Sequence, residues 1–222
     1  MKMDIKSDKF SAMLEMLIAI ILGITAVLTA YASWQSSLYG GNQATNYTKG
    51  TAMIGEANSM YNEAAQYIAQ DMNTWNTINS LRVDLEFAKY YEDTDEQERV
   101  QWKIDQIMAD NVSEGLSAAI DWADAQTEYA SPFDKEGYLE SYYVDANATY
   151  EQGEATIEEG QKANSLGDKL GLVTVIFAVV LFILGIVSNF KNIKTKIVVT
   201  GISILAMLFG LIMMLSVPML TL

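Results

Sequence analysis

The residue types that most often carry out chemistry in proteins are missing from this sequence. The chain of 222 residues contains no cysteine and no histidine. Without cysteine there is no thiolate nucleophile, no disulfide and no thiolate metal site. Without histidine, the commonest general base near neutral pH and the commonest metal ligand are absent, and a triad of the serine-hydrolase type lacks its base. We therefore expect a protein that is not an enzyme, with no catalytic residue, no metal ligand set and no cofactor.

Carboxylates are abundant, but their spacing does not match an ion-binding loop. Asp93, Asp95 and Gln97 begin like a calcium loop, yet Glu98 stands at the sixth position, where the turn requires glycine. The acidic stretch 151–159 predicts a solvated helix face, with weak association of cations as the alternative. Residues 35–169 hold 25 acidic and 8 basic residues, so this region repels the phosphates of nucleic acid and we expect no such partner.

Polar and small residues recur at helical spacing within the apolar runs. Thr25 and Thr29 lie one helical turn apart and predict either bonds to the carbonyls of their own helix or, as the alternative, the lining of a pore. Two seams of small residues favour close packing of helices in lipid, within one bundle or between subunits. The first seam comprises Ala19, Gly23, Ala26, Ala30 and Ser33, and the second comprises Gly171, Thr174, Ala178, Gly185 and Ser188.

Three uncharged runs are long enough to cross a membrane as helices. They cover residues 16–34, 170–190 and 197–217, which are 19, 21 and 21 residues long, and about 20 apolar residues span the hydrocarbon layer. The first run is the least hydrophobic of the three. Its lysine-containing leader and Ala30-Tyr31-Ala32 also resemble a cleaved secretory signal, but the leader has no net positive charge and the run is long for a signal. We therefore expect three transmembrane helices in contact with lipid.

The lysines predict the orientation of these spans. All six lysines outside the large domain lie in residues 1–15 and in the loop 191–196. Lysine in short flanking segments marks the cytoplasmic side. The sequence therefore predicts a multi-pass protein of the cell membrane, with residues 1–15 and 191–196 in the cytoplasm. The acidic domain, residues 35–169, and the tail, residues 218–222, are then extracytoplasmic.

The large domain reads as helix throughout, because it has a single proline and no alternating strand pattern. We expect the chain to break or bend at Gly40 and Gly41, and then four helices. The first covers about 42–91, and the second starts at a capping box of Thr94 and Gln97. The third is capped at Ser113, and the fourth runs from about Lys135 into the second span. The first and fourth should pair antiparallel, so the predicted fold is all-α: three spans plus a long, coiled-coil-like extramembrane domain.

This layout resembles that of a known group of proteins. The matching stretches are Ala26-Val27-Leu28-Thr29-Ala30-Tyr31-Ala32-Ser33, which leads into Glu56-Ala57-Asn58, and residues 177–210. They resemble a group of uncharacterised prokaryotic membrane proteins with an amino-terminal span, a long helical region and a closing hairpin of two spans. The resemblance implies the same topology and carries no activity with it.

Together these features favour a structural or interaction protein that forms homo-oligomers in the membrane and projects a helical stalk. A cation-favouring channel, or a channel accessory with an acidic vestibule, is the alternative, based on the polar first span. A sensor of extracytoplasmic ligands is a second alternative, although the short cytoplasmic segments leave little to transmit a signal.

Overall fold

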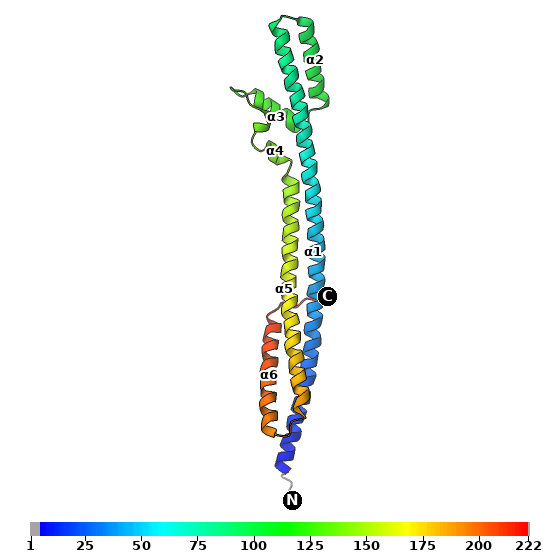
Figure 1. Cartoon of the computed structure of the whole chain (residues 1–222), viewed down its shortest axis with the longest axis vertical. Helices are drawn as coiled ribbons and strands as arrows, with labels where there is room; N and C mark the ends of the chain where they lie inside the picture. The colour runs from blue at the N-terminus through cyan, green and yellow to red at the C-terminus, as the bar shows by residue number, and fades with distance from the viewer. Residues whose placement is uncertain (1–4, 222) are drawn as a thin grey trace. The chain divides into compact units, whose positions relative to one another are not determined.

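Helices make up all of the regular structure described here. The computed structural model describes residues 5–221, with side chains from Phe10 to Thr221, and contains no strand within that range. The elements are α1 (Ile5–Tyr90), α2 (Thr94–Asp110), α3 (Glu114–Asp124), the 3-10 helix η1 (Pro132–Asp134), α4 (Tyr138–Ser141), α5 (Val144–Val187) and α6 (Ile193–Leu215) (Figure 1). The predicted all-α class is confirmed. The side chains of Lys2, Lys6 and Lys9, on which the predicted orientation rests in part, lie outside the described residues.

Helix α1 continues through the glycine pair at which a break was predicted. Gly40 and Gly41 both lie inside α1, and a Cβ added to either would meet no atom within 4 Å. Each glycine lowers helix propensity by about 1 kcal/mol relative to alanine. The neighbouring Tyr39 is buried, and its hydroxyl donates to the carbonyl of Pro218 at 2.6 Å. The prediction of a break was wrong because this packing holds the helical turn in place.

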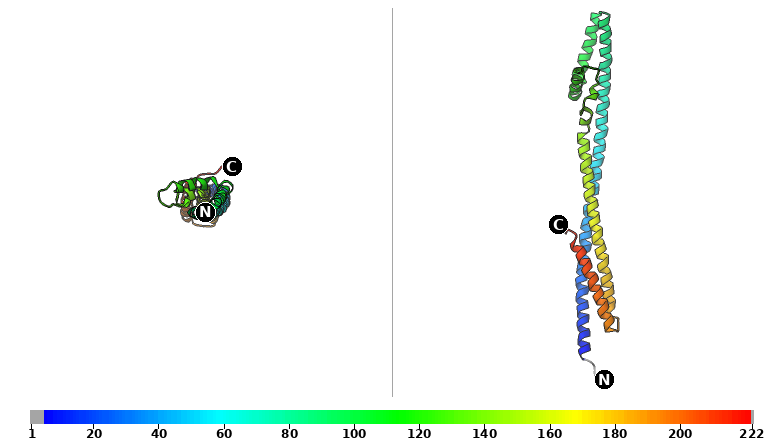
Figure 2. Two further views of the ribbon diagram at one scale, coloured as in Figure 1. Left: turned by 90° about the horizontal axis from the view of Figure 1, so that it is seen from above. Right: turned by 90° about the vertical axis from the view of Figure 1, so that its left-hand side faces the viewer.

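The chain forms two compact units, one of residues 1–50 with 155–222 and one of residues 51–154. In the first unit, α5 and α6 lie beside the first part of α1 (Figure 2). The buried positions of both long helices step by three and four residues. On α1 they are Leu14, Ile18, Ile21, Thr25 and Ala32, with the half-buried Leu28 between the last two, and on α5 they are Leu170, Val173, Phe177, Val180, Leu184 and Val187. This spacing produces one interior stripe per helix, as expected for helices packed at a shallow angle.

Three helices of the described chain are long and apolar enough to cross a membrane. They are the segment Phe10–Tyr90, which contains most of α1, together with α5 and α6. Many of their large apolar side chains, such as Met13, Val27 and Phe182, are exposed in the folded chain. Exposed apolar surface of this extent suits contact with lipid. The prediction of three apolar helices is therefore confirmed.

The second unit has a core of its own. Trp75, Ile78 and Leu85 from α1 pack with residues of α2, α3 and α4, namely Val100, Ile104, Leu116, Ala119, Ile120 and Tyr138. The predicted cap of α3 is confirmed, because the Ser113 hydroxyl accepts from the Leu116 amide at 3.1 Å. The cap of α2 is Asp93, which accepts from the Glu96 amide at 3.0 Å, so the predicted box at Thr94 was placed one residue too late.

The predicted fourth helix is divided before it becomes continuous. A capping box between Ser131 and Asp134 caps the start of η1, and Gly137 has φ of +79°, a conformation that favours glycine. The continuous helix α5 begins only at Val144. In the first unit it runs antiparallel to α1, because Ser36 bonds to Gly167 while Tyr47, further along α1, lies against Gly160, which is earlier in α5. In the second unit Tyr61 of α1 bonds to Asn147 of α5.

Candidate functional site

The small-residue seam of the first span lies on the outside of the bundle. Ala19, Gly23, Ala26, Ala30 and Ser33 are all exposed, whereas the interior of the bundle is reached by the other face of α1. No atom lies within 4 Å of a Cβ added at Gly23. This seam was predicted to pack either within one bundle or between subunits. Because its residues are exposed, it does not pack within the bundle of this chain. The face remains free for a neighbouring helix.

The second seam is partly half-buried and partly exposed. Gly171 and Thr174 are half-buried, while Ala178, Gly185 and Ser188 are exposed. The hydroxyl of Thr174 donates to the Leu170 carbonyl at 3.1 Å, and that of Ser188 donates to the Gly185 carbonyl at 3.4 Å. These bonds satisfy both hydroxyls within their own helix. The exposed residues of the second seam therefore form a surface of small side chains, and the hydroxyl on this surface is already hydrogen-bonded within its own helix.

The two threonines of the first span hydrogen-bond to protein atoms of this chain. Thr25 is 0% exposed, and its hydroxyl lies 2.8 Å from the Ile21 carbonyl and 3.2 Å from the Met207 sulfur. Thr29 donates to the Thr25 carbonyl at 2.7 Å. These are the intrahelical bonds that threonine commonly makes in apolar helices. Pore lining by this pair remains a prediction, and the observed contacts belong to the packed interior of one bundle.

A partly buried ion pair joins the beginning of α6 to α1. Lys196 was expected in the loop 191–196, but it lies in the first turns of α6, is 8% exposed and places its Nζ 3.1 Å from Glu15 Oε1. One helical turn further along, the Thr200 hydroxyl is buried and has no partner among the described residues. Glu15 is half exposed, so the pair keeps one side near solvent while fixing how α6 packs on α1.

The segment after α6 is attached to α1 by a side-chain amide. Gln35 is 1% exposed, its Nε2 donates to the Leu220 carbonyl at 2.9 Å, and its Oε1 accepts from the Leu220 amide at 2.9 Å. Together with the bond from Tyr39 to Pro218, this pairing satisfies backbone groups that no helix serves. Gln35 was not among the residues predicted to have a role. The available signal was an amide placed on the apolar stripe of α1, three residues after Ala32.

The most densely bonded polar cluster lies in the second unit. Asp71 is 5% exposed and accepts hydrogen bonds from the hydroxyls of Tyr138, at 2.5 Å, Tyr142 and Ser113. Burial, together with the hydrogen bond to Asp71, raises the pKa of both tyrosines above its usual value. The cluster joins α1 to the cap of α3 and to α4. This cluster was not predicted from the sequence either. The available signal was an aspartate, Asp71, on the apolar stripe of Ile68, Trp75 and Ile78.

The surroundings of this cluster do not form a metal site. A groove of about 440 Å³ beside Asp71 is lined by Tyr67, Gln70, Asp110 and Asn111, among others. Among the described residues, no three histidine, cysteine, aspartate or glutamate side chains are grouped so as to hold a metal ion. In the acidic stretch 151–159, Glu158 pairs with Lys162 at 2.9 Å, and the pKa of Glu158 is lowered by this lysine. The predicted weak association with cations remains untested.

Comparison with protein-family models, curated proteins and solved structures finds no match for this chain.

Proposed function

We propose that this protein is a non-enzymatic integral membrane protein that assembles with copies of itself through the first span and carries an acidic helical stalk. The observation that supports the proposal is the free seam of Ala19, Gly23, Ala26, Ala30 and Ser33, which faces away from the interior of its own bundle. The absence of cysteine and histidine from the whole sequence fits a role in structure or interaction better than one in catalysis.

The physics of helix association in lipid favours this face as the contact. Lipid and leucine are equally apolar, so helices associate by close packing, which small residues permit. Ala19 and Gly23 are four residues apart, as are Ala26 and Ala30, so each pair lies on one side of α1. A bulky side chain at Gly23 or Ala26 would hold the two backbones apart.

The orientation that we propose has the acidic domain outside the cell membrane and the loop between α5 and α6 in the cytoplasm. Lys191 and Lys194 are exposed in and beside that loop. Lysine near the ends of spans favours the cytoplasmic side. The resemblance to three-span prokaryotic proteins agrees with this topology.

The oligomer is tested by enlarging the seam. We expect Gly23→Leu combined with Ala26→Leu to shift the purified protein toward monomer, as measured by light scattering in mild detergent and by cross-linking in native membranes. Gly201→Leu is the matched control, because Gly201 is also exposed and a Cβ there also meets nothing within 4 Å, but it lies on α6.

Two results would contradict the proposal. A wild-type protein that is monomeric both in detergent and in membranes does not self-associate. An oligomer that survives the double substitution, or that the Gly201 control disrupts equally, uses another face.

A further inference from the structure

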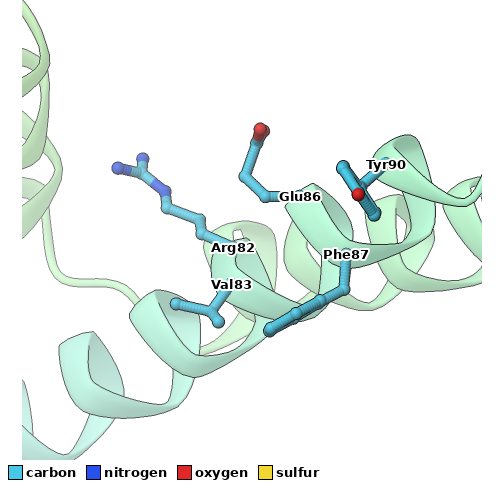
Figure 3. A pocket seen from close by; sticks show the side chains of 5 residues that line it. All are labelled: Arg82, Val83, Glu86, Phe87 and Tyr90. Carbon is cyan, nitrogen blue, oxygen red and sulfur yellow. The ribbon is translucent and has the colours of Figure 1, made fainter.

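The last turns of α1 carry an exposed apolar face, which we call the Val83 face. Its members are Val83, Phe87 and Tyr90, which are 49%, 60% and 80% exposed. Figure 3 shows Val83 and Phe87 side by side on the helix surface, with Glu86 directed away from them. Spacing by four and three residues places all three on one side of the helix. Aromatic side chains of this exposure are the usual anchors of protein interfaces.

The core of the second unit does not use this face. The same turns of α1 already pack into that core through Ile78, Leu85 and Ala88, which are buried. One face is sufficient to hold a helix in a bundle, so a second apolar face on these turns is not required for folding. The side chains of the Val83 face do not pack into the core of the second unit, so they are available to contact another molecule.

Acidic residues border the Val83 face. By helix geometry Asp84 lies on one side of it and Glu86 on the other. Arg82 does not offset them, because both of its terminal nitrogens bond to Asp124 at 2.7 Å and its guanidinium stacks over Trp75. Lys89 forms an ion pair with Glu86 at 2.7 Å and balances the charge of that residue only. Residues 51–154 as a whole hold 22 acidic and 5 basic residues.

The negative charge around the Val83 face determines which kind of partner can bind there. A second copy would bring one strongly acidic unit against another, and an anionic membrane surface would be repelled in the same way. An amphipathic helix with an apolar stripe bordered by lysine or arginine complements both the stripe and its acidic borders. We propose that the Val83 face binds a cationic amphipathic helix of a partner protein, with Phe87 as the central apolar anchor.

The test uses the full chain in nanodiscs of neutral lipid and three synthetic helical peptides. The first peptide has a leucine stripe bordered by lysines. The second replaces the lysines with glutamates, and the third keeps the lysines but replaces the leucines with serines. Binding to immobilised protein is measured after subtraction of empty nanodiscs. We expect the first peptide alone to bind appreciably, and Phe87→Ser to weaken it about tenfold in Kd, as for an interface anchor.

Tyr129→Ser is the matched control, because Tyr129 is an 82% exposed aromatic residue of the same unit that is not a member of the Val83 face. Both variants change exposed side chains and should retain the helical circular dichroism of the parent. Equal binding to parent and Phe87→Ser would mean diffuse charge attraction and would overturn the proposal. So would binding of the glutamate peptide, or a change in oligomeric state on Phe87→Ser, which would identify a second copy as the occupant.

Discussion

At the scale of single residues, three of the buried polar side chains, Asp71, Gln35 and Lys196, act as attachments between segments. Asp71 receives three hydroxyl donors from two segments, the cap of α3 and the turn of α4, Gln35 pairs with both backbone groups of Leu220, and Lys196 reaches Glu15. Burying a polar group costs free energy unless it is hydrogen-bonded. Each of these residues therefore fixes the position of a partner segment as well as stabilising its own.

Asp71 allows a direct test of this role. Asp71→Ala leaves the hydroxyls of Tyr138 and Tyr142 without their acceptor in a buried site, which should cost about 2–4 kcal/mol of unfolding free energy. Urea unfolding of the second unit can be followed by fluorescence, because Trp75 is buried in the same unit. Asp110→Ala, at an exposed carboxylate of the adjacent groove, should change the stability little. Equal losses for the two variants would show that the hydroxyl bonds contribute no net stability.

At the scale of elements, the close approach of α6 to α5 depends on one glycine. A Cβ placed on Gly210 would lie 2.6 Å from Cε1 of Phe177 and 3.3 Å from Cγ2 of Ile176. Phe177 is completely buried, so its ring has little space into which to move. The two helices can therefore pack at this point only because Gly210 has no side chain.

We expect Gly210→Ala to lower the thermal unfolding midpoint in detergent, because overpacking of a filled interior costs about 1–3 kcal/mol. Gly201→Ala, on the same helix but with open space around it, removes a glycine without a clash and should leave the midpoint unchanged or raise it. A Gly210 variant as stable as the Gly201 variant would mean that Phe177 can rearrange, and that the observed contact does not limit the packing.

At the scale of the whole molecule, the proposed orientation places the two ends of the first unit on opposite sides of the membrane. Lys49 lies on α1 beyond the first span, and Lys194 lies at the start of α6. Both positions are exposed, and the sequence has no native cysteine that would interfere with labelling.

Single-cysteine labelling decides between the two orientations. An impermeant maleimide applied to intact cells should modify Lys49→Cys and leave Lys194→Cys unmodified until the cells are opened. The reverse pattern would place the acidic domain in the cytoplasm and would show that the lysine bias of the short segments does not set the orientation here.

The sequence alone determined the helical class and the three apolar helices, because both follow from local periodicity and from the length of apolar runs. It also located the cap at Ser113. It failed at Gly40 and Gly41, where tertiary packing outweighs local propensity. It also failed at Lys196, which composition placed in a loop and which an ion pair with Glu15 draws into the bundle.

Other features could be decided only by the tertiary structure. The seam of Ala19, Gly23, Ala26, Ala30 and Ser33 is visible in the sequence, but its exposure depends on which face of α1 the other helices cover. The roles of Asp71, Gln35 and Gly210 likewise depend on residues tens of positions away, or more than a hundred. Spacing along one chain segment defines the faces of a helix, and only the packing of the whole chain determines what each face meets.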